Sequence, residues 1–236
     1  MMIIFSIINL IRLLFLFLFS VLLFPFIKNK AIYFFLKFAG PTFIKLGQLL
    51  ANRPDLVGDD LAFCLSDFQD KLPAFAFKKV KKIIENQLGK PLDKLFLEFD
   101  IKPVAAASIA QVHKAKTLAG DVVAVKTVRP GIEIIFKRDV ATLKLLGFLI
   151  GIFSRYYKEK LINVTEVVAD CGRKELDLHF EAAAAGQMKE QLKNLPGFYI
   201  PKIYWQFSSD KVLTLEWIDG IPFSDKKAIL NSGFDK

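Results

Sequence analysis

One lysine, Lys126, stands alone in the β-branched run Val122–Val128, and an unusual loop precedes that run. The segment from Pro103 to Ala115 reads as a strand, a loop and a second strand. A strand lysine beneath such a loop is typical of nucleotide sites, where the ammonium group neutralises phosphate oxygens. The alternative is an ordinary lysine at a strand edge. The candidate nucleotide-binding residues are Lys126, Ala105, Ala106, Ala107 and Ser108.

The loop has alanines where phosphate-covering loops normally have glycines. Glycine allows positive φ and close approach of backbone N–H groups to a phosphate, and a methyl group resists both. We therefore expect a stiffer loop that holds the nucleotide in a different pose, with the Ser108 hydroxyl donating to a phosphate oxygen. Replacing Ala106 with glycine is expected to change the nucleotide preference.

Three carboxylates follow in the segment KELDLHFEAAAA: Glu175, Asp177 and Glu181. On one helix, Asp177 and Glu181 share a face and Glu175 points away from it. Two carboxylates would then face one pocket, and the third would make another contact. The alternative is a solvated helix with scattered charges.

The remaining reactive side chains predict no further site. We interpret His113 and His179 as structural residues. The cysteines, Cys64 and Cys171, lie far apart and indicate neither a disulfide framework nor a metal site. No metal ligand set is predicted.

Hydrophobic periodicity and turn signals predict the elements that carry these residues. A helix starts near Thr42 as its N-cap and ends at Arg53-Pro54. The other predicted helices are 61–70, 77–89, 134–157 and 164–192. The strands are predicted in 96–117, at 122–128 and on both sides of the turn Ser208–Asp210.

This order of elements is that of the smaller, nucleotide-covering lobe of a protein kinase, in which a helix carboxylate holds the strand lysine. The predicted fold class is therefore α+β: a kinase-like N-lobe with an antiparallel sheet and a C-helix. An N-terminal helical extension and a hydrophobic anchor helix precede it.

The first 30 residues predict a membrane anchor. The run Ile3–Ile27 is apolar except for Arg12 and exceeds the roughly 20 residues needed to cross a bilayer. Lys28 and Lys30 follow it and favour a cytoplasmic location for the rest of the chain. A cleaved signal peptide and a buried core helix are the alternatives.

The net charge of +9 also requires an explanation. The basic run from Lys78 to Lys82 is either the solvated face of a helix or a surface that attracts anionic lipid headgroups. No basic groove with interleaved aromatic residues and no DNA-binding motif is apparent, so nucleic acid is not an expected partner.

Six segments in consecutive order, between about Ala39 and Pro222, resemble the UbiB family of atypical, protein-kinase-like proteins. They are GPTFIKLGQLLANRPDL, LSDFQDKLPAF, PVAAASIAQVHKA, VAVKTVRPGI, KELDLHFEAAAA and LEWIDGI. The resemblance implies an ATPase-like protein of ubiquinone biosynthesis at the bacterial inner membrane. It implies ATP with magnesium as cofactor and an indirect role toward a polyprenyl or quinone precursor.

The resemblance also implies roles for individual residues. Lys45, Gly47 and Gln48 match the K-x-G-Q signature of a helical extension folded over the nucleotide pocket. Glu175 and Asp177 match an E-x-D motif that is expected to meet that extension. Glu181 matches the C-helix glutamate that pairs with Lys126, although Glu175 stays an alternative.

The motifs for catalysis are expected after the hinge-like segment LEWIDGI. Kinase-like folds place there an aspartate–asparagine catalytic loop and a D-F-G aspartate that binds the metal. The residues after Ile221 contain neither. We therefore expect the chain to be the front part of such a protein, to contact nucleotide, and to lack activity unless a separate chain supplies the C-terminal lobe.

The predicted divisions are an anchor (1–30), a helical extension (31–95), the sheet lobe (96–222) and the start of a missing lobe (223–236). Two other interpretations stay open: a degenerate pseudokinase, and a membrane-anchored module that binds lipid or protein.

Overall fold

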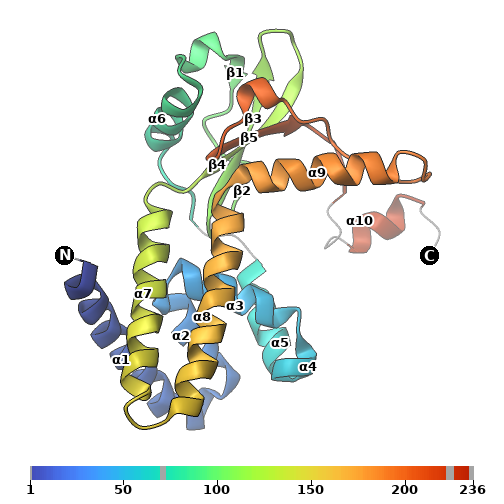
Figure 1. Cartoon of the computed structure of the whole chain (residues 1–236). Coiled ribbons are helices and arrows are strands. Elements are labelled where there is room, and N and C mark those ends of the chain that lie inside the picture. The colour runs from blue at the N-terminus through green and yellow to red at the C-terminus, as the bar shows by residue number, and fades with distance from the viewer. Residues whose placement is uncertain (1, 70–72, 222–225, 234–236) are drawn as a thin grey trace.

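The computed structural model of the chain describes residues 2–69, 73–221 and 226–233, and it places a helical layer beneath a small sheet (Figure 1). The helical layer begins with α1 (Met2–Ile27), α2 (Asn29–Ala39), α3 (Pro41–Ala51), α4 (Pro54–Val57), α5 (Asp59–Ser66) and the 3₁₀ turn η1 (Asp67–Gln69). The sheet region begins with α6 (Phe77–Leu88), η2 (Leu92–Lys94), β1 (Phe96–Phe99), β2 (Ala105–Ala106), β3 (Ala110–Thr117) and β4 (Val122–Val128). The chain continues through α7 (Ile132–Ile150), α8 (Arg155–Leu176), α9 (Leu178–Leu192), η3 (Trp205–Phe207), β5 (Val212–Glu216) and α10 (Lys226–Asn231).

The sheet is antiparallel, with strand order β1-β3-β4-β5, and β2 pairs with the same edge of β3 as β1 does. A tight turn joins β3 to β4, and Gly120 in it has φ +95°, a conformation that glycine adopts without steric cost. The antiparallel sheet with packed helices confirms the predicted fold class.

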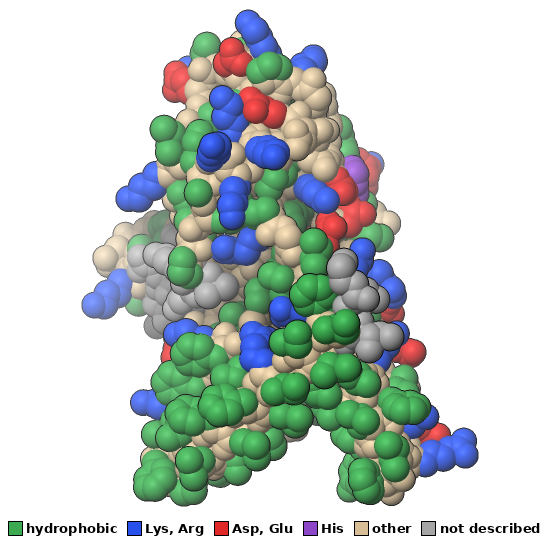
Figure 2. Space-filling view, turned by 90° about the vertical axis from the view of Figure 1, so that its left-hand side faces the viewer, with side chains coloured by type: hydrophobic (Ala, Val, Ile, Leu, Met, Phe, Trp, Pro, Cys, Tyr) green, Lys and Arg blue, Asp and Glu red, His purple; other side chains and the backbone are tan. Residues whose placement is uncertain are grey.

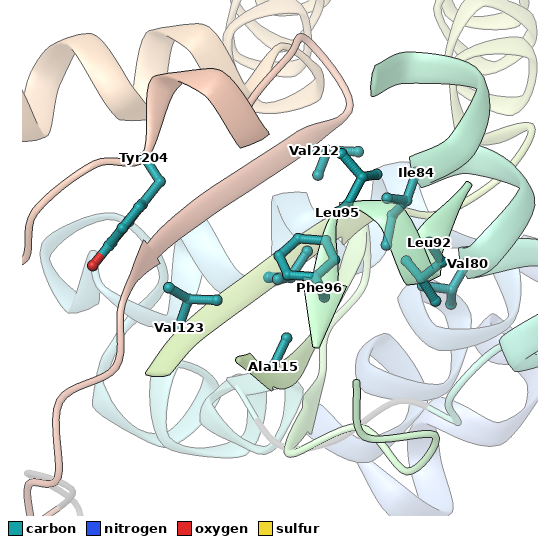
Figure 3. Close-up of a cluster of buried hydrophobic side chains, with 10 residues drawn as sticks. Val80, Ile84, Leu92, Leu95, Phe96, Ala115, Val123, Tyr204 and Val212 are labelled. Carbon is teal, nitrogen blue, oxygen red and sulfur yellow. The ribbon is translucent and has the colours of Figure 1, made fainter. Parts of the chain in front are cut away.

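The two faces of the sheet are covered by different helices. On one face, Val80 and Ile84 of α6 pack against Val123, Val125 and neighbouring side chains (Figure 3). On the other face, Leu178 and Ala182 of α9 pack against Val128 and Leu213. Alternation along β4 therefore buries Val123 and Val125 beneath α6 and turns Lys126 toward the α9 side. Burying each aliphatic side chain stabilises the fold by about 1.5–3 kcal/mol.

The helix α6 forms as the sequence predicts. Its apolar positions, Val80, Ile84 and the half-buried Leu88, recur at helical spacing and face the sheet. Gly89 ends the helix with φ +68°, the left-handed conformation that favours glycine at this position.

The helical layer has its own core. Leu13, Leu36, Phe43 and Leu65 are buried together, and Phe68 stacks on Tyr33 with ring centroids 4.4 Å apart. The helices α1 and α3 also pack against α7, so this core joins elements on both sides of the predicted boundary at residue 95.

A buried polar cluster holds this layer together. Asp139 of α7 is fully buried and accepts hydrogen bonds from the Asn9 side chain at 3.1 Å and from the Thr42 hydroxyl at 2.6 Å. Arg138 donates to the same carboxylate at 2.7 Å. The prediction that Thr42 is the N-cap of α3 is wrong, because the N-cap is Gly40, two residues earlier, and the Thr42 hydroxyl binds Asp139 instead.

The helix α1 is long and apolar enough to cross a membrane over Ile4–Ile27. Its side toward α2 and α7 is buried at Leu10 and Leu13, and its other side exposes large apolar side chains such as Ile8, Phe15 and Leu22. A core helix or a signal sequence can have the same length and composition.

Two predicted helix boundaries and one strand are wrong. Two helices were predicted, at 134–157 and 164–192, but the chain forms three over this region. It turns at 151–154 and again at Asp177. Helix-forming lysine and glutamate residues carry α8 through 158–163, where the sequence pattern suggested a gap. Before β5, the chain forms only an isolated bridge, Ile203–Leu215, and the turn η3 instead of a strand.

Some predicted boundaries lie outside the described residues. These are Asp70, the predicted end of a helix, and Pro222, the predicted end of the sheet lobe. The predicted segment 223–236 is described only over 226–233, which contains α10. The domain divisions therefore stay predictions.

Candidate functional site

Lys126 and Glu181 form a two-pronged ion pair. The Lys126 ammonium lies 2.9 Å from Oε1 and 2.6 Å from Oε2 of Glu181. The lysine side chain is 25% exposed and the glutamate side chain 47%. An ion pair so accessible to solvent contributes about 0–1 kcal/mol to stability. Its accessibility instead leaves both charges available to a ligand.

The strand register places Lys126 relative to the alanine loop. Ala105 pairs with Val112, and Val112 pairs with Lys126. Residues directly paired across antiparallel strands project on the same face. The Lys126 side chain therefore shares a sheet face with Ala105, two strand spacings or about 10 Å away.

The alanine loop is a closed hairpin. The Ala107 N–H donates to the Ala110 carbonyl at 2.8 Å, and the Val104 N–H donates to the Val112 carbonyl at 2.8 Å. These donors satisfy the hairpin, whereas a glycine-rich loop would direct such N–H groups at phosphates. Ala105 and Ala107 are exposed, but Ser108 is only 4% exposed. The phosphate contact predicted for Ser108 requires an accessible hydroxyl group, and this residue is buried.

Two side chains clamp this hairpin to the segment before α6. The Arg129 guanidinium donates to the Ala107 and Pro73 carbonyls, each at 3.0 Å, and lies over the Phe75 ring. The Gln111 amide accepts from the Phe75 N–H at 2.8 Å and donates to its carbonyl. Burial lowers the pKa of Arg129. Sequence reasoning missed Arg129 and Gln111, because contacts across 36 and 56 residues leave no local pattern.

The three candidate carboxylates have separate partners. Glu181 binds Lys126, and Glu175 binds Lys45 of α3 at 2.7 Å. Asp177 accepts from the His179 N–H at 3.0 Å and caps α9. The expected shared face of Asp177 and Glu181 does not form, because the helix breaks at Asp177.

The residues of the K-x-G-Q signature all lie on α3. Lys45 reaches α8 through Glu175, and the Gln48 amide donates to the Phe68 carbonyl at 2.8 Å. A Cβ at Gly47 would approach the Phe68 ring to 2.6 Å. Only glycine therefore allows α3 to pack this closely against the η1 turn.

His113 is a buried structural residue of the α6 face. Its Nδ1 lies 2.7 Å from the Asp100 carbonyl, and its Nε2 lies 2.8 Å from the Gln111 amide nitrogen. A neutral ring protonated on Nδ1 satisfies both contacts. Desolvation is the largest effect on the pKa of His113 and lowers it, while the Asp100 carbonyl opposes that shift.

The described site offers a positive charge and no cluster of metal-ligating side chains. Lys126 supplies a positive charge at an accessible position. Within residues 2–69, 73–221 and 226–233, no cluster of three or more His, Cys, Asp or Glu side chains is placed to hold a metal ion.

The sequence matches the family described as the ABC1 atypical kinase-like domain over residues 67–236. It is 42% identical over 198 residues to the "Probable protein kinase UbiB" of Marinobacter nauticus, covering 82% of this chain and 36% of that protein. It is 40% identical over 199 residues to the protein of the same name from Azotobacter vinelandii, covering 83% of this chain and 37% of that protein. The chain thus spans little more than a third of these relatives.

A solved structure is similar as well. The Mycobacterium tuberculosis protein Rv3197, determined in complex with erythromycin, superposes with a TM-score of 0.53 and 29% identity. The similarity covers 76% of this chain and 44% of that protein. These matches confirm the resemblance inferred from the motifs: the chain belongs to the ABC1 atypical kinase-like family, as the UbiB proteins do.

Proposed function

We propose that this chain forms the nucleotide-covering part of a UbiB-type atypical kinase or ATPase that supports ubiquinone biosynthesis at a membrane. The single observation that carries the proposal is the accessible Lys126–Glu181 pair on the sheet face that it shares with the alanine loop. In this role Lys126 contacts the α- and β-phosphates of ATP, and Glu181 orients the ammonium group.

The alanine hairpin would cover the nucleotide with methyl groups more than with N–H donors. Its Ala107 N–H and carbonyl are already bonded to Ala110 and Arg129. Ala105, on the Lys126 face, is the loop residue that lies in register with Lys126 through Val112. We propose that the Arg129 clamp keeps this cover stiff, which favours one pose of the phosphates.

The described residues contain no group of three or more His, Cys, Asp or Glu side chains that could hold magnesium by themselves. Bound magnesium would neutralise charge on the β- and γ-phosphates. We therefore propose that catalysis requires a C-terminal kinase-like lobe, which would supply the catalytic loop and the metal-binding aspartate. The extension residues Lys45, Gly47 and Gln48 would lie over the cleft and restrict access by protein substrates.

We also propose that α1 anchors the chain to a membrane with the sheet lobe on the cytoplasmic side. Support comes from the apolar length of Ile4–Ile27 and from Lys28 and Lys30 directly after it. A quinone or polyprenyl precursor is itself a membrane lipid, so it would lie in the same bilayer that α1 anchors the chain to.

Nucleotide-dependent stabilisation tests the proposal. The chain is co-expressed with a C-terminal kinase-like lobe, and thermal unfolding is measured with and without Mg-ATP. Saturation at 100 times the Kd stabilises a folded protein by about 2.7 kcal/mol. Lys126→Ala is expected to remove most of the ATP-induced shift in Tm, and Lys116→Ala, on the same sheet face, is the matched control.

An ATPase assay on membranes with the same variants completes the test. Equal ATP protection in the Lys126→Ala and parent proteins would contradict the nucleotide role. That result would favour the second candidate function, a pseudokinase-like binding module. The observation that favours this candidate is that the described residues form no acidic cluster.

A further inference from the structure

The turn between α7 and α8 is an exposed apolar tip that the nucleotide role does not explain. Its side chains Phe148, Ile152, Phe153, Tyr156 and Tyr157 are all exposed, and Phe153 is 90% exposed. A soluble surface rarely gathers so many large apolar side chains in one place. We define these five residues as the aromatic tip.

The hairpin that carries the aromatic tip is tightly packed. Gly147 lies against Ile162, and a Cβ there would be 3.5 Å from the Ile162 side chain. Near the other end, Gly172 lies so close to the Phe136 ring that a Cβ would clash with it. The approach at Gly172 requires glycine and the contact at Gly147 is an ordinary packing contact, so the tip is presented by a packed pair of helices.

The tip lies at the same end of the molecule as the junction of α1 and α2 (Figure 1). Figure 2 shows hydrophobic side chains gathered on two projections at this end, with basic side chains along their edges. A groove of about 330 Å³ lies between α1 and α7 near this end, and apolar side chains such as Leu14, Phe17 and Ile150 line it. Ile150 lies two residues before Ile152 of the tip. The exposed face of α1 and the aromatic tip are therefore two apolar regions at the same end of the molecule.

The charges around the tip favour a lipid surface over a second copy of the chain. Between residues 144 and 160 there are four basic side chains and one acidic side chain. Lys158 lies 5.8 Å from the Phe148 ring centroid, and Lys160 lies 4.5 Å from that of Tyr156. Aromatic rings with lysines beside them are typical of membrane interfaces, where the lysines reach anionic headgroups. Two such tips would repel each other.

We propose that the aromatic tip of α7–α8 inserts into an anionic bilayer surface as a second membrane contact, about 120 residues after the contact made by α1. The 22-residue helix α8 spans roughly 33 Å from this tip to the Asp177 joint. Membrane insertion at the tip would thus hold the sheet and its Lys126–Glu181 pair about one helix length from the bilayer. This inference does not depend on nucleotide binding.

Tryptophan fluorescence tests the insertion. In the full chain, Trp205 and Trp217 are replaced by phenylalanine, and Phe153→Trp introduces one reporter at the tip. Phe180→Trp on α9, where the native side chain is 54% exposed, is the matched control. The protein is mixed with phosphatidylglycerol–phosphatidylcholine vesicles whose acyl chains carry bromine, a short-range quencher, and vesicle-bound protein is isolated by flotation.

Insertion predicts a blue shift and strong quenching at position 153 and neither change at position 180. Vesicles of phosphatidylcholine alone are expected to quench position 153 less, because the lysines lose their anionic partners. The proposal is overturned if position 153 stays water-exposed on vesicle-bound protein, or if the protein does not bind the vesicles. A blue shift without lipid that grows with protein concentration would also overturn it, since that result shows a second copy on the tip.

Discussion

The Lys126–Glu181 and Arg138–Asp139 pairs have nearly equal lengths, 2.6 and 2.7 Å, but opposite surroundings. Glu181 is about half exposed, whereas Asp139 is fully buried and bound by three helices. Charges in contact with water exchange partners at little cost, and a buried carboxylate does not. The first pair is therefore suited to receive a ligand, and the second pair is suited to fix α1, α3 and α7.

The largest predicted effect is on the buried pair. Asp139→Ala leaves the Arg138 charge and the Thr42 hydroxyl without their partner and removes one of the two contacts of the Asn9 amide. We expect a loss of about 3–5 kcal/mol in the free energy of unfolding. Chemical denaturation in detergent measures it. Asp55→Ala, which removes the exposed pair with Arg53, is the control. Similar losses in both variants would refute the structural role of Asp139.

The second prediction concerns packing in the same helical layer. Gly47→Ala places a methyl group 2.6 Å from the Phe68 ring, and we expect a destabilisation of about 1–3 kcal/mol. Gly186→Ala in α9 has open space around it and should stabilise the chain by roughly 0.5–1 kcal/mol. Denaturation midpoints measure both effects. If the midpoints of both variants shift in the same direction relative to the parent protein, the close approach of α3 to η1 is contradicted.

The third prediction sharpens the comparison at the exposed pair. A double-mutant cycle with Lys126→Ala and Glu181→Gln should give a coupling energy of about 1 kcal/mol or less in the absence of nucleotide. A coupling as large as that expected for Asp139 would show that the pair is structural. The Tm shift induced by Mg-ATP, measured on the same variants, then reports the ligand role separately.

The fourth and smallest prediction is a pH effect on the opposite sheet face. Burial lowers the pKa of His113 in the folded chain, so the unfolded chain takes up a proton first as pH falls. Stability should therefore be constant above the unfolded-state value of roughly 6.5 and should decrease as pH falls below it. Thermal unfolding as a function of pH measures this. The decrease in stability with falling pH should persist in a variant of the exposed His179 and should be smaller in His113→Gln. If His113→Gln leaves that decrease unchanged, His113 is not its cause.

The sequence predicted the sheet better than the helices around it. The alternation of Val122–Val128 and the turn at Gly120 are local signals, and both the strand and its hairpin form as expected. The boundaries at 151–154 and Asp177 were not predicted. Helix-forming residues continue on both sides of Asp177, so composition alone does not locate that break, whereas Gly151 is a local signal for the first break that the predicted helix 134–157 passed over.

The candidate site was predicted in part. Lys126, the alanine loop and the glutamates were recognisable because a strand lysine, a loop and an acidic helix follow one another in the sequence. Which glutamate meets Lys126 depends on the break at Asp177, which separates Glu175 on α8 from Glu181 on α9. The Arg129 clamp and the Asp139 cluster join residues 22 to 130 positions apart, and such contacts have no periodic signature.

The sequence by itself determined the family, the strand that carries Lys126, and the apolar character of α1. These properties depend on residue type and short-range spacing, which are set before the chain folds. Only the tertiary structure decided that Glu181 binds Lys126, that Asp139 is buried, and that the α7–α8 tip lies at the same end of the molecule as the α1–α2 junction. Each of these depends on how distant helices pack, because partner choice and burial arise from long-range contacts.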